Sequence, residues 1–382
     1  MPTTTAKNIL YRFLLPFAPH VCISPLIHWN SSPLNHVSAF SHVVRHHHIS
    51  GGAFLFSTPE KNISAYTGAF HSDLFPSSDC FFRVASITKM ATSLLAFRLQ
   101  DLGLLDLSAP VTEVLFGSRN VPELQKVTIL HLLSHTSGLS DPPELESFLT
   151  HGKPYSVAVS GMRTSEPGTS FHYSNLGFGL LGCIFESVLN LPLSRIYQDF
   201  LFAPLSMNAS IDGSSLPESR IMPVVRILPY HPGQIMTITP LGRHPLTAPD
   251  PSLHYGHSAG SMYTDISSLY TLLCCIRDHG SPIFSSAHTM KKQLASYGRL
   301  SPTLSYGAGL LIIRDARLSS SVIYGHQGFA YGCVDGAFWE ESTGNMMISL
   351  NGGCSEARTG RLGLVNFDLC RFAFRKEFPS WI

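Results

Sequence analysis

The chain of 382 residues lacks several features that define large classes of protein. Only 13% of its residues are charged, and 26 basic side chains are balanced by 25 acidic ones. Because binding to a polyanion needs a basic surface, this balance leaves no electrostatic case for nucleic acid as a partner. The sequence also contains no apolar run of 18 residues, so we expect no membrane span.

Cysteine pairs with metal-ligand or redox spacing are absent too. Eight cysteines occur, none in a Cys-x-x-Cys arrangement, and Cys274 and Cys275 lie in an apolar run typical of a packed helix. We therefore expect reduced thiols. No acidic residue precedes Glu60, but the apolar stretch near the N-terminus is broken by Arg12 and Pro16 and no clear cleavage site follows it. The resulting expectation is a cytoplasmic protein.

Hydrophobic residues make up 44% of the chain, which predicts a large core. Residues 1–48 are rich in Pro, His and Ser, and we interpret them as an N-terminal extension of unknown role. The three consecutive histidines at 46–48 do not converge on one metal ion in a strand or helix, which favours a solvated segment. We expect the main domain over residues 49–375 and a short tail at 376–382.

The order of the predicted elements indicates an α+β fold. Strands come early, helices occupy the middle, and strands return before a last helix, so we expect one antiparallel sheet shared by both chain ends, flanked by helices, with a mostly helical region inserted. The insert at 212–258 has no assignable pattern. The predicted strands are 51–57, 63–70, 306–313, 320–324, 331–339 and 346–351, and the main predicted helices are 86–102, 175–188, 265–278 and 356–375.

A Ser-x-x-Lys motif begins the first long apolar helix. Residues three apart on a helix lie on one face, so Ser86 and Lys89 are expected to point into the same pocket. The helix N-terminus adds unpaired N–H groups and partial positive charge. An amine beside a hydroxyl, with backbone donors nearby, is a chemical setting for a serine nucleophile. A serine that merely caps the helix is the alternative interpretation.

Two further motifs follow in order, Tyr-Ser-Asn at 173–175 and His-Gln-Gly at 326–328. With the Ser-x-x-Lys motif they resemble the serine β-lactamase and penicillin-binding-protein superfamily, in its class C β-lactamase, D-Ala-D-Ala carboxypeptidase and esterase branch. The segments FRVASITK, TILHLLSHTSGL, FHYSNLGFGLLG and YGAGL extend the resemblance over about residues 49–375. It implies the β-lactamase/transpeptidase-like fold. His-x-Gly replaces Lys-Thr-Gly here, and a neutral histidine holds the carboxylate of a β-lactam less well than a lysine.

The resemblance implies acyl transfer through an acyl-enzyme. Ser86 would be the nucleophile, and Lys89, with a pKa lowered by burial, would accept its proton. Tyr173 would relay the proton to the leaving group, which a phenol with a pKa of about 10 can do at neutral pH only beside a cation such as Lys89. No metal or organic cofactor is needed. His135, in a tight turn, is interpreted as a structural hydrogen-bonding residue rather than a second base.

The substrate-binding residues that the resemblance implies come from the second and third motifs. Asn175 would bond to the lysine or to the substrate, and His326 would orient the substrate or adjust the tyrosine. Phe329 would contribute its N–H to an oxyanion hole together with that of Ser86, and Gly328 would allow the backbone to approach the substrate closely. The partner is thus a small-molecule acyl substrate.

The expected function is a serine esterase or acyltransferase (transesterase) that acts on a small ester or thioester, with secondary metabolism as one setting. A D-amino-acid peptidase, a carboxypeptidase or a β-lactamase is the alternative within the same chemistry, and a non-catalytic scaffold is the alternative outside it. Four aromatic residues near the proposed site fit either an apolar acyl pocket or core packing: Phe171, Phe178, Phe329 and Tyr331.

Overall fold

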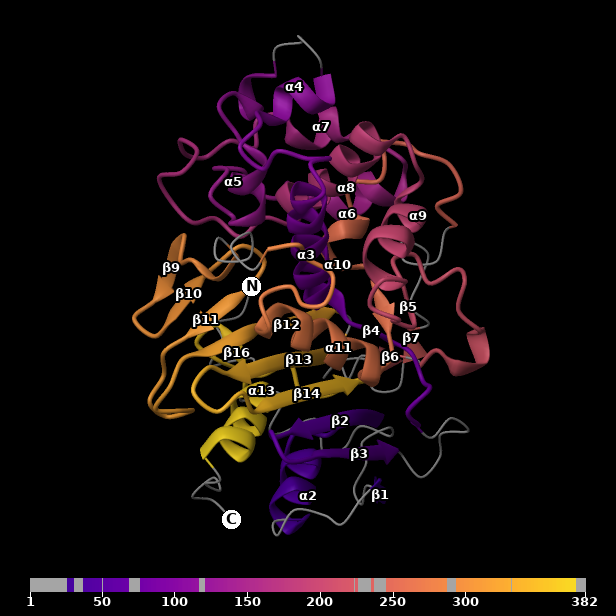
Figure 1. The fold of residues 1–382 in the computed structure, drawn as a ribbon, viewed down its shortest axis with the longest axis vertical. Coiled ribbons are helices and arrows are strands. Elements are labelled where there is room, and N and C mark those ends of the chain that lie inside the picture. The colour runs from indigo at the N-terminus through magenta and orange to yellow at the C-terminus, as the bar shows by residue number, and fades with distance from the viewer. Residues whose placement is uncertain are drawn as a thin grey trace.

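The computed structural model describes residues 26–30, 37–49, 51–68, 76–116, 121–222, 224–225, 235–236, 245–286, 293–330 and 332–375. Tyr331, the expected tail at 376–382, the first 25 residues and much of the 212–258 insert lie outside the described residues. The described part consists of a large sheet, helices on both of its faces and a helical region beyond one face (Figure 1).

Nine of the described strands form one antiparallel sheet in the order β1-β3-β2-β14-β13-β12-β11-β10-β9. The two chain ends meet where β2 pairs with β14, with Ala53 opposite Leu350. The predicted α+β fold, with a sheet shared by both chain ends, is confirmed. The strands are β1 Leu26–Trp29, β2 Gly51–Ser57, β3 Asn62–Gly68, β9 Gly298–Ser301, β10 Leu304–Tyr306, β11 Leu311–Ile313, β12 Ile323–Ala330, β13 Cys333–Glu340 and β14 Met346–Asn351.

The central strands are apolar on both sides because helices cover both faces of the sheet. Every residue of β2, β13 and β14 is buried, which accounts for their nearly continuous apolar runs. Helix α11 (Ile266–Arg277) packs against β13 and β14 from one face, in one hydrophobic cluster. Helix α13 (Leu364–Cys370) packs against the same strands from the other face, in a second cluster.

Part of the N-terminal segment packs onto this domain. Strand β1 pairs with β3, and helix α2 (Val37–His46) lies beside α13 at the lower end of Figure 1. The interpretation of residues 46–48 as a solvated segment is wrong for His47, which is 1% exposed. Its Nε2 lies 2.8 Å from Oδ2 of Asp368, because α2 packs against α13 and His47 directly follows α2.

The helical region surrounds α3, which stands at the centre of Figure 1. Nearly all of its residues from Thr88 to Leu99 are buried, including polar ones such as Lys89 and Thr92, so other segments enclose this helix on every side. The helices predicted at 86–102, 175–188 and 265–278 are confirmed. The helices of this region are α3 Thr88–Asp101, α4 Val111–Phe116, α5 Ile129–Leu133, α6 Leu145–Thr150, α7 Tyr155–Val159, α8 Asn175–Leu189, α9 Leu193–Tyr197 and α10 His257–Gly260.

Among the described helices, none is by itself long and apolar enough to cross a membrane. Helix α8 and the segment Leu193–Phe202 pass that test only as a pair, and they are bent by 90° at the break between them. The seven cysteines in the described part are all free thiols, as expected. Five short strands complete the described part of this region: β4 Phe82–Arg83, β8 Tyr263–Thr264 and β5 Ala209–Ser210 form a small sheet, and β6 Val224–Val225 pairs with β7 Ile235–Met236.

Two predictions about the C-terminal part are wrong. The single strand expected at 306–313 is a hairpin of β10 and β11, and its turn includes Gly309 with φ of 74°. The closing helix expected at 356–375 starts only at Leu364, because β15 (Arg358–Thr359) and β16 (Leu362–Gly363) pair around Gly360, with φ of 60°. Glycine adopts these left-handed conformations without strain, and hydrophobic periodicity does not detect such turns.

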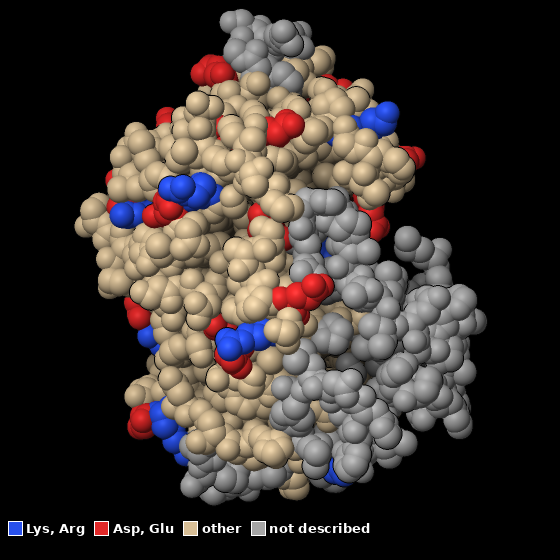
Figure 2. Space-filling view, turned by 90° about the vertical axis from the view of Figure 1, so that its right-hand side faces the viewer, with Lys and Arg blue, Asp and Glu red and all other residues tan. Residues whose placement is uncertain are grey.

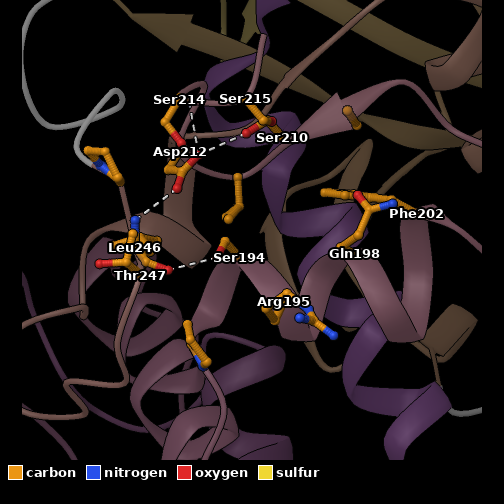
Figure 3. Close-up of a pocket in the computed structure, with 14 residues that line it drawn as sticks. Ser194, Arg195, Gln198, Phe202, Ser210, Asp212, Ser214, Ser215, Leu246 and Thr247 are labelled. Atoms are coloured by element: carbon orange, nitrogen blue, oxygen red, sulfur yellow. Dashed lines mark hydrogen bonds between the residues drawn. The ribbon is translucent and has the colours of Figure 1, made fainter.

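Asp212 is the first residue of the insert that had no assignable pattern, and its carboxylate bonds to described residues on either side of it, including Leu246 (Figure 3). Backbone N–H groups of Ser214 and Leu246 donate to its carboxylate at 3.0 Å, and the Ser210 hydroxyl donates at 2.9 Å. Burial alone would raise the pKa of Asp212, but these hydrogen bonds outweigh it and the pKa lies below its usual value. Asp212 also lines a cavity of about 460 Å³ that includes Ser194.

Candidate active site

Ser86 lies in a short 3-10 turn, Ala85–Ile87 (η2), directly before α3. Strand β12 packs against this turn, and a Cβ added at Gly328 would lie 2.3 Å from the carbonyl oxygen of Val84. Only glycine allows this close approach. Ala85 has φ of 46°, a left-handed conformation in which a residue other than glycine is strained. The candidate nucleophile is thus held in a strained turn pressed against β12.

The amine of Lys89 is buried and contacts three oxygen atoms. Its Nζ lies 3.1 Å from Oγ of Ser86, 2.9 Å from Oδ1 of Asn175 and 2.6 Å from the carbonyl oxygen of Ala259. Desolvation lowers the pKa of Lys89 from 10.5 to about 7, although the charge of Asp141 acts in the opposite direction. A substantial fraction of this amine is therefore neutral near pH 7 and able to accept a proton from the adjacent hydroxyl.

The hydroxyl of Tyr173 donates to Oγ of Ser86 at 2.8 Å. The Tyr173 ring centre lies 5.0 Å from Nζ of Lys89. Although 39% of the residue is exposed, desolvation raises the pKa of its phenol well above the usual 10, and the hydrogen bond from Tyr173 to Ser86 only partly offsets this. Tyr173 is therefore protonated at neutral pH and is a proton donor beside the nucleophile.

The imidazole ring of His135 packs against the ring of Tyr173. Its ring lies 4.3 Å from the ring of Tyr173, and its Nδ1 accepts a hydrogen bond from the backbone N–H of Ser174 at 3.1 Å. The imidazole is buried, and desolvation holds its pKa well below the usual 6.5. The structural interpretation of this histidine is thus supported by its contacts.

Asn175 is held by a carboxylate that the sequence analysis did not single out. Asp141 accepts hydrogen bonds from the Ser174 hydroxyl, from the backbone N–H groups of Asn175 and Leu176, and from the Asn175 side chain, all at 2.9–3.0 Å. An anion at the first turn of α8 is favoured by the helix dipole. In the sequence, Asp141 is marked only by its position at the end of the segment TILHLLSHTSGLSD. No local pattern connects it to helix α8, which starts 34 residues later.

His326, Gly328 and Phe329 all lie on β12, but they do not share one environment. Phe329 lines the cavity that contains Ser86, whereas the side chain of His326 is buried and is not part of the cavity lining. Nε2 of His326 bonds with the Tyr306 hydroxyl at 2.9 Å, and its Nδ1 bonds with the carbonyl oxygen of Gln327 at 2.7 Å. Desolvation lowers the pKa of His326 to about 3, so the ring is neutral and both nitrogens are engaged.

The cavity beside Ser86 has a volume of about 530 Å³. It is lined by the nucleophile turn, α6, the segment around α10, the end of β12 and the start of β15. Its charged residues are mixed in sign: Arg83 and Arg358 against Glu146 and Glu356. The described surface in Figure 2 likewise shows basic and acidic side chains close together. Among the residues described, no group of three or more His, Cys, Asp or Glu could hold a metal ion.

The sequence was compared with known protein families and with curated proteins. A family model described as Beta-lactamase matches residues 37–337, so the chain belongs to the β-lactamase family. Esterase EstB of Burkholderia gladioli is 33% identical over 178 residues, which cover 41% of this chain and 43% of that protein. Monacolin J acid methylbutanoyltransferase of Aspergillus terreus is 26% identical over 206 residues, which cover 44% of this chain and 49% of that protein. The chain spans about half the length of the curated relatives it matches.

The fold was compared with solved structures. A penicillin-binding protein from Bacillus halodurans aligns with a TM-score of 0.67 at 20% sequence identity, and the alignment covers 85% of this chain and 97% of that one. At this identity the likeness shows the fold alone. The β-lactamase/transpeptidase-like fold expected from the sequence motifs is thereby confirmed.

Proposed function

We propose that this protein is a serine acyl hydrolase or acyltransferase that forms an acyl-enzyme at Ser86. One observation carries the proposal: Oγ of Ser86 lies within 3.1 Å of an amine with a pKa of about 7 and within 2.8 Å of a protonated phenol. These are the base and the acid that a serine needs to attack an ester and release its alcohol.

Acylation proceeds in three proton transfers. Neutral Lys89 accepts the proton of Ser86 as Oγ attacks the acyl carbon. The N–H groups of Ser86 and Phe329 are the proposed donors to the oxyanion, and the packing of β12 against η2 supports this assignment. The tetrahedral intermediate then collapses, and Tyr173 gives its proton to the leaving alcohol or thiol. Protonated Lys89 restores the proton on the tyrosine, and water or a second alcohol enters by the reverse sequence.

The substrate class that we propose is a small ester or thioester, with secondary metabolism as one setting. The names of the two curated relatives, an esterase and a methylbutanoyltransferase, support this choice. The third motif supports it as well, because the buried neutral ring of His326 provides no cation for the carboxylate of a β-lactam.

A D-amino-acid peptidase or a β-lactamase is the second candidate. The observation in its favour is that two guanidinium groups, those of Arg83 and Arg358, line the cavity and are of the kind that binds a carboxylate. A non-catalytic scaffold is disfavoured, since it has no need for a buried lysine and a tyrosine converging on one serine hydroxyl.

Intact-mass spectrometry tests the proposal. The protein is incubated separately with a p-nitrophenyl ester, a short acyl thioester and a penicillin. We expect a mass gain of one acyl group from the ester or thioester in the wild type and in Ser156→Ala, an exposed serine on α7, but none in Ser86→Ala. A stable adduct from penicillin alone would select the second candidate. Equal labelling of Ser86→Ala would refute the nucleophile.

A further inference from the structure

Of the aromatic residues considered for an acyl pocket or for core packing, two of the described ones pack in the protein. Phe178 is buried in the core, and Phe171 packs against the ring of Tyr306 at 5.5 Å. Among the described members of this group, only Phe329 lines the cavity beside the nucleophile. One face of its ring is covered by the guanidinium of Arg358, whose central carbon lies 3.8 Å from the ring centre. The apolar wall of the cavity must therefore come from other residues.

Three leucines form that wall. Leu145 and Leu149 lie on α6, and Leu253 lies in the segment before α10; all three line the same cavity as Ser86. Each is only partly buried, so aliphatic surface remains exposed to the cavity. Covering such surface with an apolar group is favourable, at roughly 25 cal/mol per Å².

The length of helix α10 gives the approximate separation between the three leucines and the nucleophile turn, because its two ends lie next to them. At its start, a Cβ added to Gly256 would lie 2.9 Å from Cδ2 of Leu149. At its end, a Cβ added to Gly260 would lie 3.7 Å from the carbonyl carbon of Ala85, next to Ser86. Four helical residues rise about 6 Å. An acetyl group on the serine is too short to reach the leucines, whereas a chain of several carbons reaches them.

Most of the charged lining of the cavity comes from other segments. Arg83 lies on the strand before the nucleophile turn, and Glu356 and Arg358 lie at or just before the start of β15, whereas Glu146 lies on α6 next to Leu145. A polar leaving group or acceptor fits this side, which leaves the leucine side for the acyl chain.

We propose that the acyl group of the substrate is an unbranched or branched aliphatic chain, from butanoyl to octanoyl, that lies against Leu145, Leu149 and Leu253. This inference rests on the proposed function of Ser86. It makes Gly256 a determinant of chain length, because a methyl group there would press on Leu149 and move it. Gly256 has φ of −100°, so alanine is compatible with its backbone.

The test measures kcat/KM for p-nitrophenyl acetate, butanoate, hexanoate and octanoate, with the acyl-enzyme followed by intact mass. Each methylene that becomes buried is expected to raise kcat/KM about fourfold, so butanoate should exceed acetate by more than tenfold. Leu149→Ala should reduce this ratio severalfold. Gly256→Ala should reduce it as well, with the largest loss for the longest chain. Leu104→Ala, an exposed leucine outside the cavity, is the matched control and should keep the wild-type ratio.

The outcomes separate this inference from the proposed function. An acyl-enzyme on Ser86 with equal kcat/KM for all four esters would overturn the aliphatic wall and leave the nucleophile in place. No acyl-enzyme from any ester would overturn the proposed function itself. If Leu149→Ala does not fold, Gly256→Ala decides the matter, and an unchanged ratio in that variant counts against the inference.

Discussion

The pH dependence of acylation is the sharpest consequence of the buried lysine. Lys89 acts as a base only in its neutral form, and its pKa of about 7 sets the fraction that is neutral. That fraction is about 10% at pH 6 and about 90% at pH 8 for a group with this pKa. The acylation rate of Ser86 should therefore rise roughly tenfold between these values and level off above pH 8. Lys89→Arg keeps a permanent charge and should lose 10²–10⁴-fold, the usual contribution of a general base.

A second perturbation tests the sign of this shift. The Asp141 carboxylate raises the pKa of Lys89, so Asp141→Asn should move the half-maximal rate to lower pH. The assay is single-turnover release of p-nitrophenol from p-nitrophenyl butanoate between pH 5.5 and 9, with the exposed Asp106→Asn as the matched control. A flat profile from pH 6 to 8, or a rise only near the pKa of a solvated lysine, would refute the assignment of Lys89 as the base.

Three further predictions concern Lys89, Gly328 and Asp212. Lys89→Met should raise the free energy of unfolding at pH 7 by about 2 kcal/mol in urea titrations, because the shift from 10.5 to about 7 costs about 5 kcal/mol and the lost hydrogen bonds return only part of that. This gain should shrink as pH rises toward 10.5, and a destabilised variant would contradict it. Gly328→Ala should slow acylation by about 10²-fold with an unchanged circular dichroism spectrum, since its Cβ would collide with the Val84 carbonyl and displace β12 from the nucleophile turn; a wild-type rate would count against this placement. Asp212→Ala should lower the free energy of unfolding by about 3 kcal/mol, because it leaves the Leu246 N–H and other donors unpaired, while Ser86 acylation persists. Thermal melts measure this, and an unchanged melting temperature would show that the carboxylate does not stabilise the insert.

Several elements could be predicted because their signals are local. The spacing of Ser86 and Lys89 places both on one helical face, and the structure brings their side chains within hydrogen-bond distance. The hairpin of β2 and β3 follows from two short β-like runs separated by a turn that includes Pro59 and Glu60. Helix α11 starts where Asp265 caps it, with its side chain accepting from the N–H of Ser268.

The roles of the second and third motifs were harder to predict because they depend on contacts distant in sequence. His326 is expected from its motif to orient the substrate or to adjust Tyr173; in the structure its ring is buried and neutral and bonds with the Tyr306 hydroxyl. Tyr173 is expected to relay a proton beside a cation such as Lys89; its ring does lie 5.0 Å from Nζ of Lys89, but desolvation raises the pKa of the phenol and keeps it protonated. In both cases burial decides the protonation state, and burial is a property of the packed chain.

Sequence alone determined the family, the sheet shared by both chain ends and the identity of Ser86, Lys89 and Tyr173 as the residues that converge. The family and the role of Tyr173 follow from the resemblance of three ordered motifs to a known superfamily, whereas the pairing of Ser86 with Lys89 follows from helical spacing and the shared sheet from the order of the predicted elements. Only the tertiary structure decided the chemistry around them. The pKa of Lys89 is about 7 because α3 is buried on all sides. Its amine is oriented by Ala259, which lies 170 residues later in the chain, and by Asn175 on α8. Desolvation and long-range hydrogen bonds set these properties, and both arise only when distant segments pack together.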